Sequence, residues 1–424
     1  MKAKLKLFIA IFSLFVACAF AADWPQYLGP KRDSTSVEKG LLRLWPKEGP
    51  KVLWTAPIGI GYGGPVVSGG KVYMLDRDDK VGDNLRCFDL SSGKELWSFA
   101  YDAPGSFNHP GSRSTPSVDG SNIYSCGPLG DLYCINTGTR KPVWNKNFWK
   151  DFGGGPLPRW AITQNPLIYG NLVIVAPQTS QTSVVAYDKL TGELKWKSPV
   201  LSGAAGYVSP SIVKIDGADH LVMIMAGVGF GRNASGGSVN GLDPLTGKVL
   251  WTYGNWQCGI PVPHAVDAGQ GRVLITGGYS AGAAMIKVQK KGDGSYGVAE
   301  LFKTIDFGAH TQPPILYKDH FYAQYTINER SDGLVCMDMD GKIRWKTGED
   351  PLFNKGGSIL ADDLLLSVDG NKTLYLIQPD PSGFKPLASV EILESGENWA
   401  PIALSGGKLL IRDQKNLKCL QVVP

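Results

Sequence analysis

Side chains that could bind a ligand gather just ahead of short apolar segments that begin with proline. Three residues before such a proline stand Tyr62, Arg113, Thr163, Tyr207 and His310, and close by in the sequence lie Trp160, Gln164, His264, Lys355 and Trp399. Aromatic, cationic and imidazole groups together can hold an anionic ligand, a planar ligand or a sugar. The alternative is that these residues only bond to one another and to water.

Two smaller sets of residues raise the question of a metal. His264 and His310 come ahead of successive segments and could approach each other, but without a third ligand a hydrogen-bonded structural pair is favoured. Residues 76–79 contain three aspartates and Arg77, which favours a solvated loop over a Ca²⁺ site. We therefore predict no metal site.

No catalytic set of residues stands out. The glycine-rich stretch from Gly227 to Gly237 lacks the following helix and the glycine spacing of a phosphate-binding loop, so we expect a hairpin loop there. No Ser/His/Asp order and no zinc-binding spacing is evident. Cys258 could face the ligand-binding groups, but a buried, inert thiol is favoured.

The elements that position these side chains belong to a repeat. CFDLSSGKELW (87–97), AYDKLTGELKW (186–196), GLDPLTGKVLW (241–251), CMDMDGKIRW (336–345) and the degenerate CINTGTRKPVW (134–144) share one pattern. Each predicts a strand, a tight turn in which Asp accepts backbone hydrogen bonds and Gly adopts positive φ, and a second strand. The closing Trp requires a neighbouring sheet to cover it. The repeat residues are Asp89, Gly93, Trp97, Trp144, Asp188, Gly192, Trp196, Asp243, Gly247, Trp251, Asp338, Gly341 and Trp345.

The spacing of the repeat predicts the fold. Eight segments start 43 to 53 residues apart, at Pro65, Pro116, Pro166, Pro210, Pro263, Pro313, Ser358 and Pro401. This period fits the four-stranded antiparallel blade of an all-β, eight-bladed β-propeller, whose inner strands surround a channel. The last start leaves room for three strands, so we expect residues 52–56, with Trp54, to complete that blade and close the ring. The fifth blade should end near Phe302.

The cysteines fit this repeat better than a disulfide framework. Cys87, Cys134, Cys336 and Cys419 share one repeat position, which Ala186 and Gly241 fill elsewhere, so a small buried site is expected. Cys126 lies on the strand next to Cys134, and a local disulfide there is left open.

The chain begins with features of export. Lys2, Lys4 and Lys6 precede an apolar run over residues 7–20 and an Ala-Phe-Ala cleavage signal, which predicts a signal peptide over residues 1–22. Cys18 as a lipidated residue is the alternative, with a poor lipobox. We thus expect a periplasmic or extracellular protein.

The segment that follows, residues 23–50, is expected to be extended and to pack on the propeller of residues 51–424. Trp24, Tyr27 and Trp45 would then lie across the propeller or its underside, and the alternative is a partner-docking arm. Without the leader the chain has 40 basic and 38 acidic residues and no basic block, which excludes a nucleic-acid partner. No later stretch could span a membrane, and we expect a monomer.

The motifs resemble the tryptophan-docking repeats of pyrroloquinoline-quinone-like (PQQ-like) propellers, over nearly all of the chain from Trp54 onward. The segment WPQYLGP (24–30) resembles the opening of exported bacterial PQQ-like proteins of unassigned role. Quinoprotein alcohol dehydrogenases of this type imply PQQ, Ca²⁺, a catalytic Asp and an adjacent cysteine pair, and this sequence lacks the pair. BamB-like propeller lipoproteins imply a non-enzymatic, eight-bladed scaffold.

The function predicted from these features is a non-enzymatic binding or scaffold propeller that engages a protein, peptide or glycan at the channel mouth, with no cofactor. The alternative is a PQQ-dependent dehydrogenase that uses the same face, with Arg113, His310 and Trp399 as contacts. A third hypothesis is a carbohydrate-active protein that stacks sugars on Tyr62, Tyr207 and Trp399.

Overall fold

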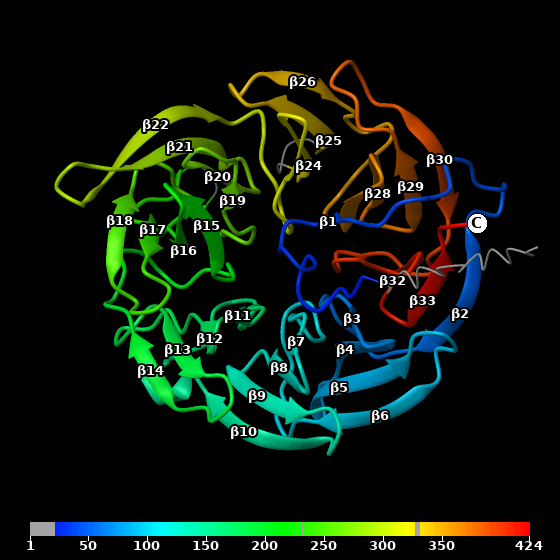
Figure 1. Ribbon diagram of the computed structural model, residues 1–424, viewed down its shortest axis with the longest axis horizontal. Coiled ribbons are helices and arrows are strands. Elements are labelled where there is room, and N and C mark those ends of the chain that lie inside the picture. The colour runs from blue at the N-terminus through cyan, green and yellow to red at the C-terminus, as the bar shows by residue number, and fades with distance from the viewer. Residues whose placement is uncertain (1–21, 231–232, 327–330) are drawn as a thin grey trace, which may run out of the picture.

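Eight four-stranded antiparallel blades surround a central channel in the computed structural model, which describes residues 22–230, 233–326 and 331–424 (Figure 1). The predicted all-β, eight-bladed propeller is confirmed. The short 3₁₀ turn η1 (Lys150–Phe152) is the helical element that lies wholly within the described residues. No helix among them is long and apolar enough to cross a membrane.

Blades are numbered here in chain order, with strands given from the channel outward. Blade 1 has β3 (Val66–Ser68), β4 (Lys71–Asp78), β5 (Gly82–Asp89) and β6 (Glu95–Ala100). Blade 2 has β7 (Ser117–Asp119), β8 (Asn122–Cys126), β9 (Asp131–Asn136) and β10 (Lys141–Asn147). Blade 3 has β11 (Leu167–Tyr169), β12 (Leu172–Val175), β13 (Val185–Asp188) and β14 (Leu194–Lys197). Blade 4 has β15 (Ser211–Ile215), β16 (Ala218–Met225), β17 (Ser238–Leu242) and β18 (Val249–Tyr253).

The other half of the ring repeats this arrangement. Blade 5 has β19 (Val266–Asp267), β20 (Arg272–Gly277), β21 (Gly282–Lys290) and β22 (Tyr296–Thr304). Blade 6 has β23 (Ile315–Tyr317), β24 (His320–Thr326), β25 (Ser331–Asp338) and β26 (Ile343–Lys346). Blade 7 has β27 (Ser358–Ala361), β28 (Leu364–Val368), β29 (Thr373–Ile377) and β30 (Pro386–Glu391), and blade 8 has β31 (Ala403–Ser405), β32 (Lys408–Arg412), β33 (Asn416–Gln421) and β2 (Lys51–Pro57).

Burial along the strands reflects their place between two neighbouring blades. Every residue of β12 and β28 is buried, because both faces of a middle strand are covered by adjacent sheets. In contrast, β6 has no buried residue and lies at the outer edge of its blade. The hydrophobic core is therefore divided into layers between successive blades.

The repeat residues join each blade to the next. The indole of Trp144 in blade 2 packs on the turn of blade 3, where a Cβ added to Gly192 would lie 2.7 Å from it. The indole also donates a hydrogen bond from Nε1 to the Lys189 carbonyl, at 3.1 Å. In that turn, Gly192 has a φ of 71°, and Asp188 accepts hydrogen bonds from two backbone amides. The same contact recurs for the pairs Trp54–Gly93, Trp196–Gly247 and Phe302–Gly341.

The ring closes between the two ends of the propeller, as predicted. Strand β2 pairs antiparallel with β33, and Trp54 lies opposite Cys419. The Trp54 indole then donates to the Leu90 carbonyl of blade 1, at 2.9 Å. In this way blade 8 gains its outer strand from the start of the propeller and docks on blade 1, which closes the ring. The fifth blade ends at β22, which contains Phe302, as expected.

The cysteine position of the repeat is a small buried site. Cys134 is fully buried between Tyr124 and Trp144 on the adjacent strands, and Cys87, Cys336 and Cys419 are equally buried. Cys126 pairs with Leu132 and not with Cys134, and all six cysteines within the described residues are free. No local disulfide is formed. Burial raises the pKa of Cys258 to about 12, which keeps this thiol inert near neutral pH.

Residues 76–79 form the expected solvated loop only in part. Asp78 is exposed at the end of β4 and Asp79 lies in the following turn, whereas Asp76 and Arg77 lie within β4 and are only 4% exposed. Arg77 donates to Asp83 at 2.6 Å and to the carbonyls of Ala103 and Gly105, and Asp76 pairs with Arg86 at 2.9 Å. For Asp76 and Arg77 the prediction failed because the strand runs farther than its apolar part, and paired charges can be buried when they are hydrogen-bonded.

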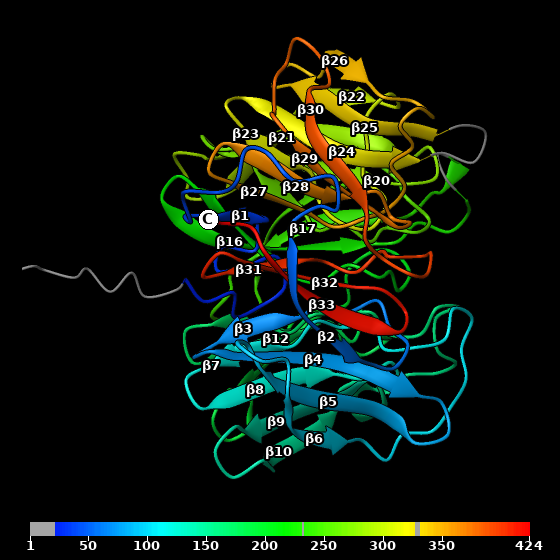
Figure 2. The same ribbon diagram turned by 90° about the vertical axis from the view of Figure 1, so that its right-hand side faces the viewer.

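The segment before β2 runs across one face of the propeller (Figures 1 and 2). Trp24 forms a β-bridge with Val67 of blade 1, and Arg32 donates to the Pro166 carbonyl of blade 3. Strand β1 (Thr35–Ser36) then adds to blade 7 in parallel with β27. Trp24 and Tyr27 are 2% and 6% exposed, so these aromatic side chains are part of the interior.

Candidate functional site

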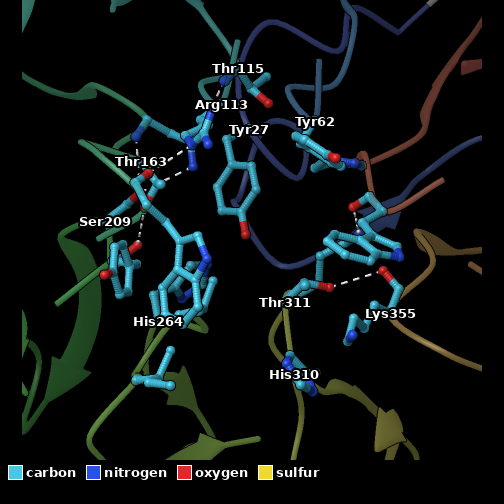
Figure 3. Close-up of a pocket in the computed structure, with 18 of the residues that line it drawn as sticks. Tyr27, Tyr62, Arg113, Thr115, Thr163, Ser209, His264, His310, Thr311 and Lys355 are labelled. Carbon is cyan, nitrogen blue, oxygen red and sulfur yellow. Dashed lines mark hydrogen bonds between the residues drawn. The ribbon is translucent and has the colours of Figure 1, made fainter. Parts of the chain in front are cut away.

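The loops that precede the inner strands surround a pocket at the channel mouth, with a volume of about 250 Å³ (Figure 3). Most of its lining residues come from equivalent positions of different blades, because the loops converge on the channel axis. The pocket is lined by Tyr27, Tyr62, His109, Arg113, Thr115, Trp160, Thr163, Asn165, Tyr207, Ser209, Ile260, Val262, His264, Tyr279, His310, Thr311, Gln312, Lys355, Trp399 and Pro401.

The structure brings eight of the nine candidate mouth residues to this pocket. They are Tyr62, Arg113, Trp160, Tyr207, His264, His310, Lys355 and Trp399, and Thr163 joins them. Gln164 lies elsewhere: it is 1% exposed and its side-chain amide accepts a hydrogen bond from the Ala176 backbone N–H, at 2.7 Å, and donates to the Ala176 carbonyl. Its side chain therefore ties its own blade together and is not available to a ligand.

Arg113 contributes a positive charge that is held by backbone carbonyls. Its Nε donates to the Trp160 carbonyl at 2.7 Å, and the two terminal nitrogens donate to the carbonyls of Gly111, Asn108 and His109. Burial lowers the pKa of the guanidinium from its ordinary value, but arginine stays charged. Arg113 thus fixes the loops of two blades and gives the mouth a positive potential.

A second cation lies over an aromatic side chain. The Lys355 ammonium is 4.5 Å from the centre of the Trp399 ring, and Trp399 also stacks with Tyr62 at 5.3 Å. The Tyr62 hydroxyl donates to Glu397 at the rim, at 3.0 Å. Burial lowers the pKa of Lys355, although the negative charge of Glu397 opposes that shift. This side of the pocket combines aromatic surface with a cation.

Aromatic and aliphatic side chains from blades 3 to 5 line the other side of the pocket. Trp160 meets Tyr207 edge to face, at 5.3 Å, and Ile260 and Val262 add aliphatic surface. Tyr279, on the turn between β20 and β21, contacts the His310 ring at 4.3 Å. An apolar or aromatic part of a ligand could pack on this side.

His264 and His310 do not form the expected hydrogen-bonded pair. The Nδ1 of His264 is 2.9 Å from the Ala265 carbonyl, whereas the Nδ1 of His310 is 2.7 Å from the Thr326 hydroxyl. Each imidazole therefore bonds to a residue of its own blade or of the loop that leads into it. Burial lowers the pKa of His264 to about 4 and that of His310 to about 3, so both are neutral near pH 7. Within the described residues no group of three or more metal-binding side chains converges.

Tyr27 was not among the predicted site residues, yet it enters the pocket from the face of the propeller that the segment before β2 crosses. Figure 3 shows its ring near the middle of the pocket, with Arg113 and Thr163 on one side and Tyr62 on the other. The ring meets His264 edge to face at 5.9 Å, and the Arg32 guanidinium lies 5.5 Å from the ring centre. The segment that carries Tyr27 thereby forms the floor of the pocket. Tyr279 was missed as well, because it lies on a hairpin turn and not ahead of an inner strand.

Comparison with known proteins places the chain in a family. The family model described as "Outer membrane protein assembly factor BamB", of the PQQ-like repeat type, matches residues 81–347. The chain belongs to this family. The match covers blades 2 to 6 completely and the two outer strands of blade 1, β5 and β6, so it rests on the repeat that forms the ring.

Solved structures of this family and of quinoprotein enzymes share the fold. BamB from Moraxella catarrhalis superposes with a TM-score of 0.58 at 12% identity, covering 88% of this chain and 99% of that one. A quinohemoprotein alcohol dehydrogenase from Comamonas testosteroni gives a TM-score of 0.66 at 14% identity, covering 95% of this chain and 80% of the enzyme. At such identities the likeness establishes the fold alone.

Two curated relatives are quinoprotein dehydrogenases. A quinoprotein ethanol dehydrogenase of Pseudomonas aeruginosa is 28% identical over 158 residues, which are 37% of this chain and 24% of the enzyme. This chain therefore matches about a quarter of that relative's length. Both a scaffold and a dehydrogenase have this propeller, so the residues of the pocket must distinguish them.

The pocket does not fit the metal-assisted quinone chemistry of those enzymes. Among the described residues that line it, none is Asp or Glu, so neither carboxylate ligands for a Ca²⁺ ion nor a carboxylate base faces the cavity. The neutral histidines are held by Ala265 and Thr326. Aromatic surface and positive charge remain, and these groups can bind a ligand.

Proposed function

We propose that this chain is a non-enzymatic binding propeller that engages a protein, peptide or glycan through the pocket at the channel mouth. The observation that carries this proposal is the composition of the pocket, in which aromatic walls and two cations occur without a carboxylate among the described lining residues. Such a surface buries apolar area and offers hydrogen-bond donors, but its described lining offers no carboxylate base.

The family supports a protein or peptide as the first partner class to test. The matching model is described as an assembly factor, and an assembly factor acts by contacting other polypeptides. The proposal also includes export to the periplasm or the extracellular space, which rests on the predicted leader. Residues 1–21 and with them Cys18 lie outside the described residues, so a lipid anchor stays an alternative.

The test is to screen the purified chain against peptide and glycan arrays and to repeat each hit with two variants. Trp399→Ala removes an aromatic wall of the pocket, and Leu190→Ala removes an exposed side chain on the outer turn of blade 3, where Leu190 is 59% exposed. A ligand of the mouth should bind Trp399→Ala at least about tenfold more weakly. Equal binding by wild type and Trp399→Ala, for every hit, would contradict the proposed face.

The dehydrogenase alternative is favoured by one observation, the similarity to curated quinoprotein dehydrogenases. It is tested by adding PQQ with Ca²⁺ to the purified chain and by measuring quinone absorbance and dye-linked alcohol oxidation. The residues of the pocket lead us to expect neither signal. Stoichiometric cofactor binding together with alcohol oxidation would replace the binding proposal with the enzymatic one.

A further inference from the structure

Most polar side chains of the pocket already hold the loops together. Thr163 donates to the Tyr207 carbonyl, Thr311 donates to the Lys355 carbonyl, and Gln312 donates to the Trp399 carbonyl. Asn165 and Ser209 bond to each other, at 3.0 Å. These bonds link neighbouring blades around the channel. A ligand that needs many neutral hydrogen-bond partners, such as a sugar with its several hydroxyls, would have to compete with them.

Two donors in the same pocket are not used in this way. The contact of the Lys355 ammonium is with the Trp399 ring, and no ion pair with Lys355 occurs within the described residues. The contacts of Tyr27 with His264 and Arg32 involve its ring, so its hydroxyl is not engaged by the described part of the chain. Figure 3 shows this hydroxyl pointing into the pocket.

The charge of the pocket is unbalanced as well. Arg113 donates only to carbonyls within the described residues, and the part of the lining that the structure describes contains no Asp or Glu. Glu397 stands at the rim, where it accepts from Tyr62, and its exposed side chain is open to solvent. A half-buried ammonium without a direct ion pair among the described residues is costly, and an anion in the pocket would remove that cost.

We propose that the pocket binds an anionic group carried on an aromatic or apolar body, with Lys355 as the ion partner and the Tyr27 hydroxyl donating to the ligand from the floor. The apolar body would pack against Ile260, Val262 and Tyr279. This inference deepens the proposed function by naming its ligand class. A carboxylate supplies the required chemistry, either in a free aromatic acid or as an acidic side chain beside an aromatic residue in a peptide.

The segment before β2 is part of this site because it fixes Tyr27. The Trp24–Val67 bridge holds one side of Tyr27, and Arg32, which donates to the carbonyls of Asn165 and Pro166, holds the other. Since Arg32 contacts the Tyr27 ring and not the cavity, it is a positioning residue. The floor is therefore preorganised, which lowers the entropy that binding must offset.

The test compares matched probes that differ only in charge. Indole-3-acetate and indole-3-acetamide form one pair, and acetyl-Phe-Glu-amide and acetyl-Phe-Gln-amide form the other, with affinities measured by calorimetry. In wild type we expect the acid of at least one pair to bind about tenfold or more tightly than its neutral partner. The pair with the larger preference identifies the source of the carboxylate.

The variants assign the preference to the residues. Lys355→Met should abolish it, Lys355→Arg should keep it, and Tyr27→Phe should weaken acid and neutral probe alike, by about threefold to tenfold. Both Lys355→Met and Tyr27→Phe preserve side-chain volume, and their thermal unfolding is measured beside wild type to confirm the fold. Equal binding of acid and neutral probes in both pairs, or no binding at millimolar concentration, would overturn the proposal.

The two proposals can fail separately. If an array ligand loses affinity in Trp399→Ala but binds Lys355→Met as tightly as wild type, the binding function stands and the anionic ligand class is wrong. If no ligand depends on Trp399 and the acid probes show no preference, both are wrong.

Discussion

The outer ring of docking contacts and the channel mouth use equivalent positions of the blades in opposite ways. At the outer ring one contact recurs, with the aromatic side chain of one blade on the glycine turn of the next, as for Trp144 on Gly192 and Trp196 on Gly247. At the mouth, the side chain at the equivalent place varies from blade to blade, as for Tyr62, Arg113 and His310.

This difference assigns stability to the outer ring and ligand recognition to the channel mouth. A repeated contact must satisfy the same geometry wherever it occurs, and the four pairs seen here each place a Trp or Phe on a glycine turn. The mouth position is free of that requirement because its side chains point into the channel. Substitutions at the outer ring should therefore lower the free energy of unfolding, whereas those at the mouth should change binding.

The largest expected effect is at the outer ring. Trp144→Ala should lower the free energy of unfolding by about 3–5 kcal/mol, because it leaves a cavity between blades 2 and 3 and removes the hydrogen bond to Lys189. Urea unfolding followed by circular dichroism measures the loss. Trp160→Ala is the matched control at the mouth, where the side chain is partly exposed, and it should cost much less. Similar losses of the free energy of unfolding in Trp144→Ala and Trp160→Ala would contradict the assignment of stability to the outer ring.

The mouth should instead give the protein its acid sensitivity. His264 and His310 have pKa values of about 4 and 3, below the value near 6.5 expected in the unfolded chain, so the unfolded state binds more protons at low pH. Stability is full above pH 6.5 and falls as the pH drops toward 4, on the order of 3 kcal/mol for His264 once it is protonated.

The pH dependence can be assigned with variants. His264→Asn and His310→Asn together should flatten the fall in urea midpoint between pH 6.5 and 4, whereas Trp144→Ala should shift the whole curve without changing its slope. A double variant that keeps the wild-type slope would show that the acid sensitivity arises elsewhere.

The floor of the pocket should affect both stability and binding, because Arg32 holds the segment before β2 on the propeller and also positions Tyr27. Arg32→Met leaves the Pro166 carbonyl without this donor and should cost about 1–3 kcal/mol. It should also make residues 22–50 more sensitive to limited proteolysis. Lys31→Met, an exposed neighbour, is the control. Unchanged proteolysis in Arg32→Met would mean that the other contacts of the segment suffice to hold it.

The fold could be predicted from the sequence because the repeat carries its own evidence. Each Asp-Gly-Trp copy predicts a turn and a neighbour to cover the indole, and the spacing between copies gives the number of blades. Ring closure through Trp54 followed from the same pattern, since a lone closing strand at one end matched a missing strand at the other.

The site was only partly predictable for a related reason. Position ahead of an inner strand brought Arg113 and Lys355 to the pocket, but the same rule selected Gln164, whose side chain turns back onto its own blade. Tyr27 belongs to no repeat, and its entry into the channel depends on the path of a segment held by bonds to several distant blades. Spacing carries no information about such a path.

The smallest effect is expected at the cysteine position of the repeat. It tests which side chains the contact between blades requires. Cys134→Ala should cost about 1 kcal/mol, because the equivalent site of blade 3 already holds Ala186 against Trp196. Since the cysteines are free, a reducing agent should leave the unfolding temperature of wild type unchanged. A clear decrease on reduction would reveal a disulfide. A loss in Cys134→Ala as large as that in Trp144→Ala would show that the thiol position, and not the indole, dominates the contact between blades.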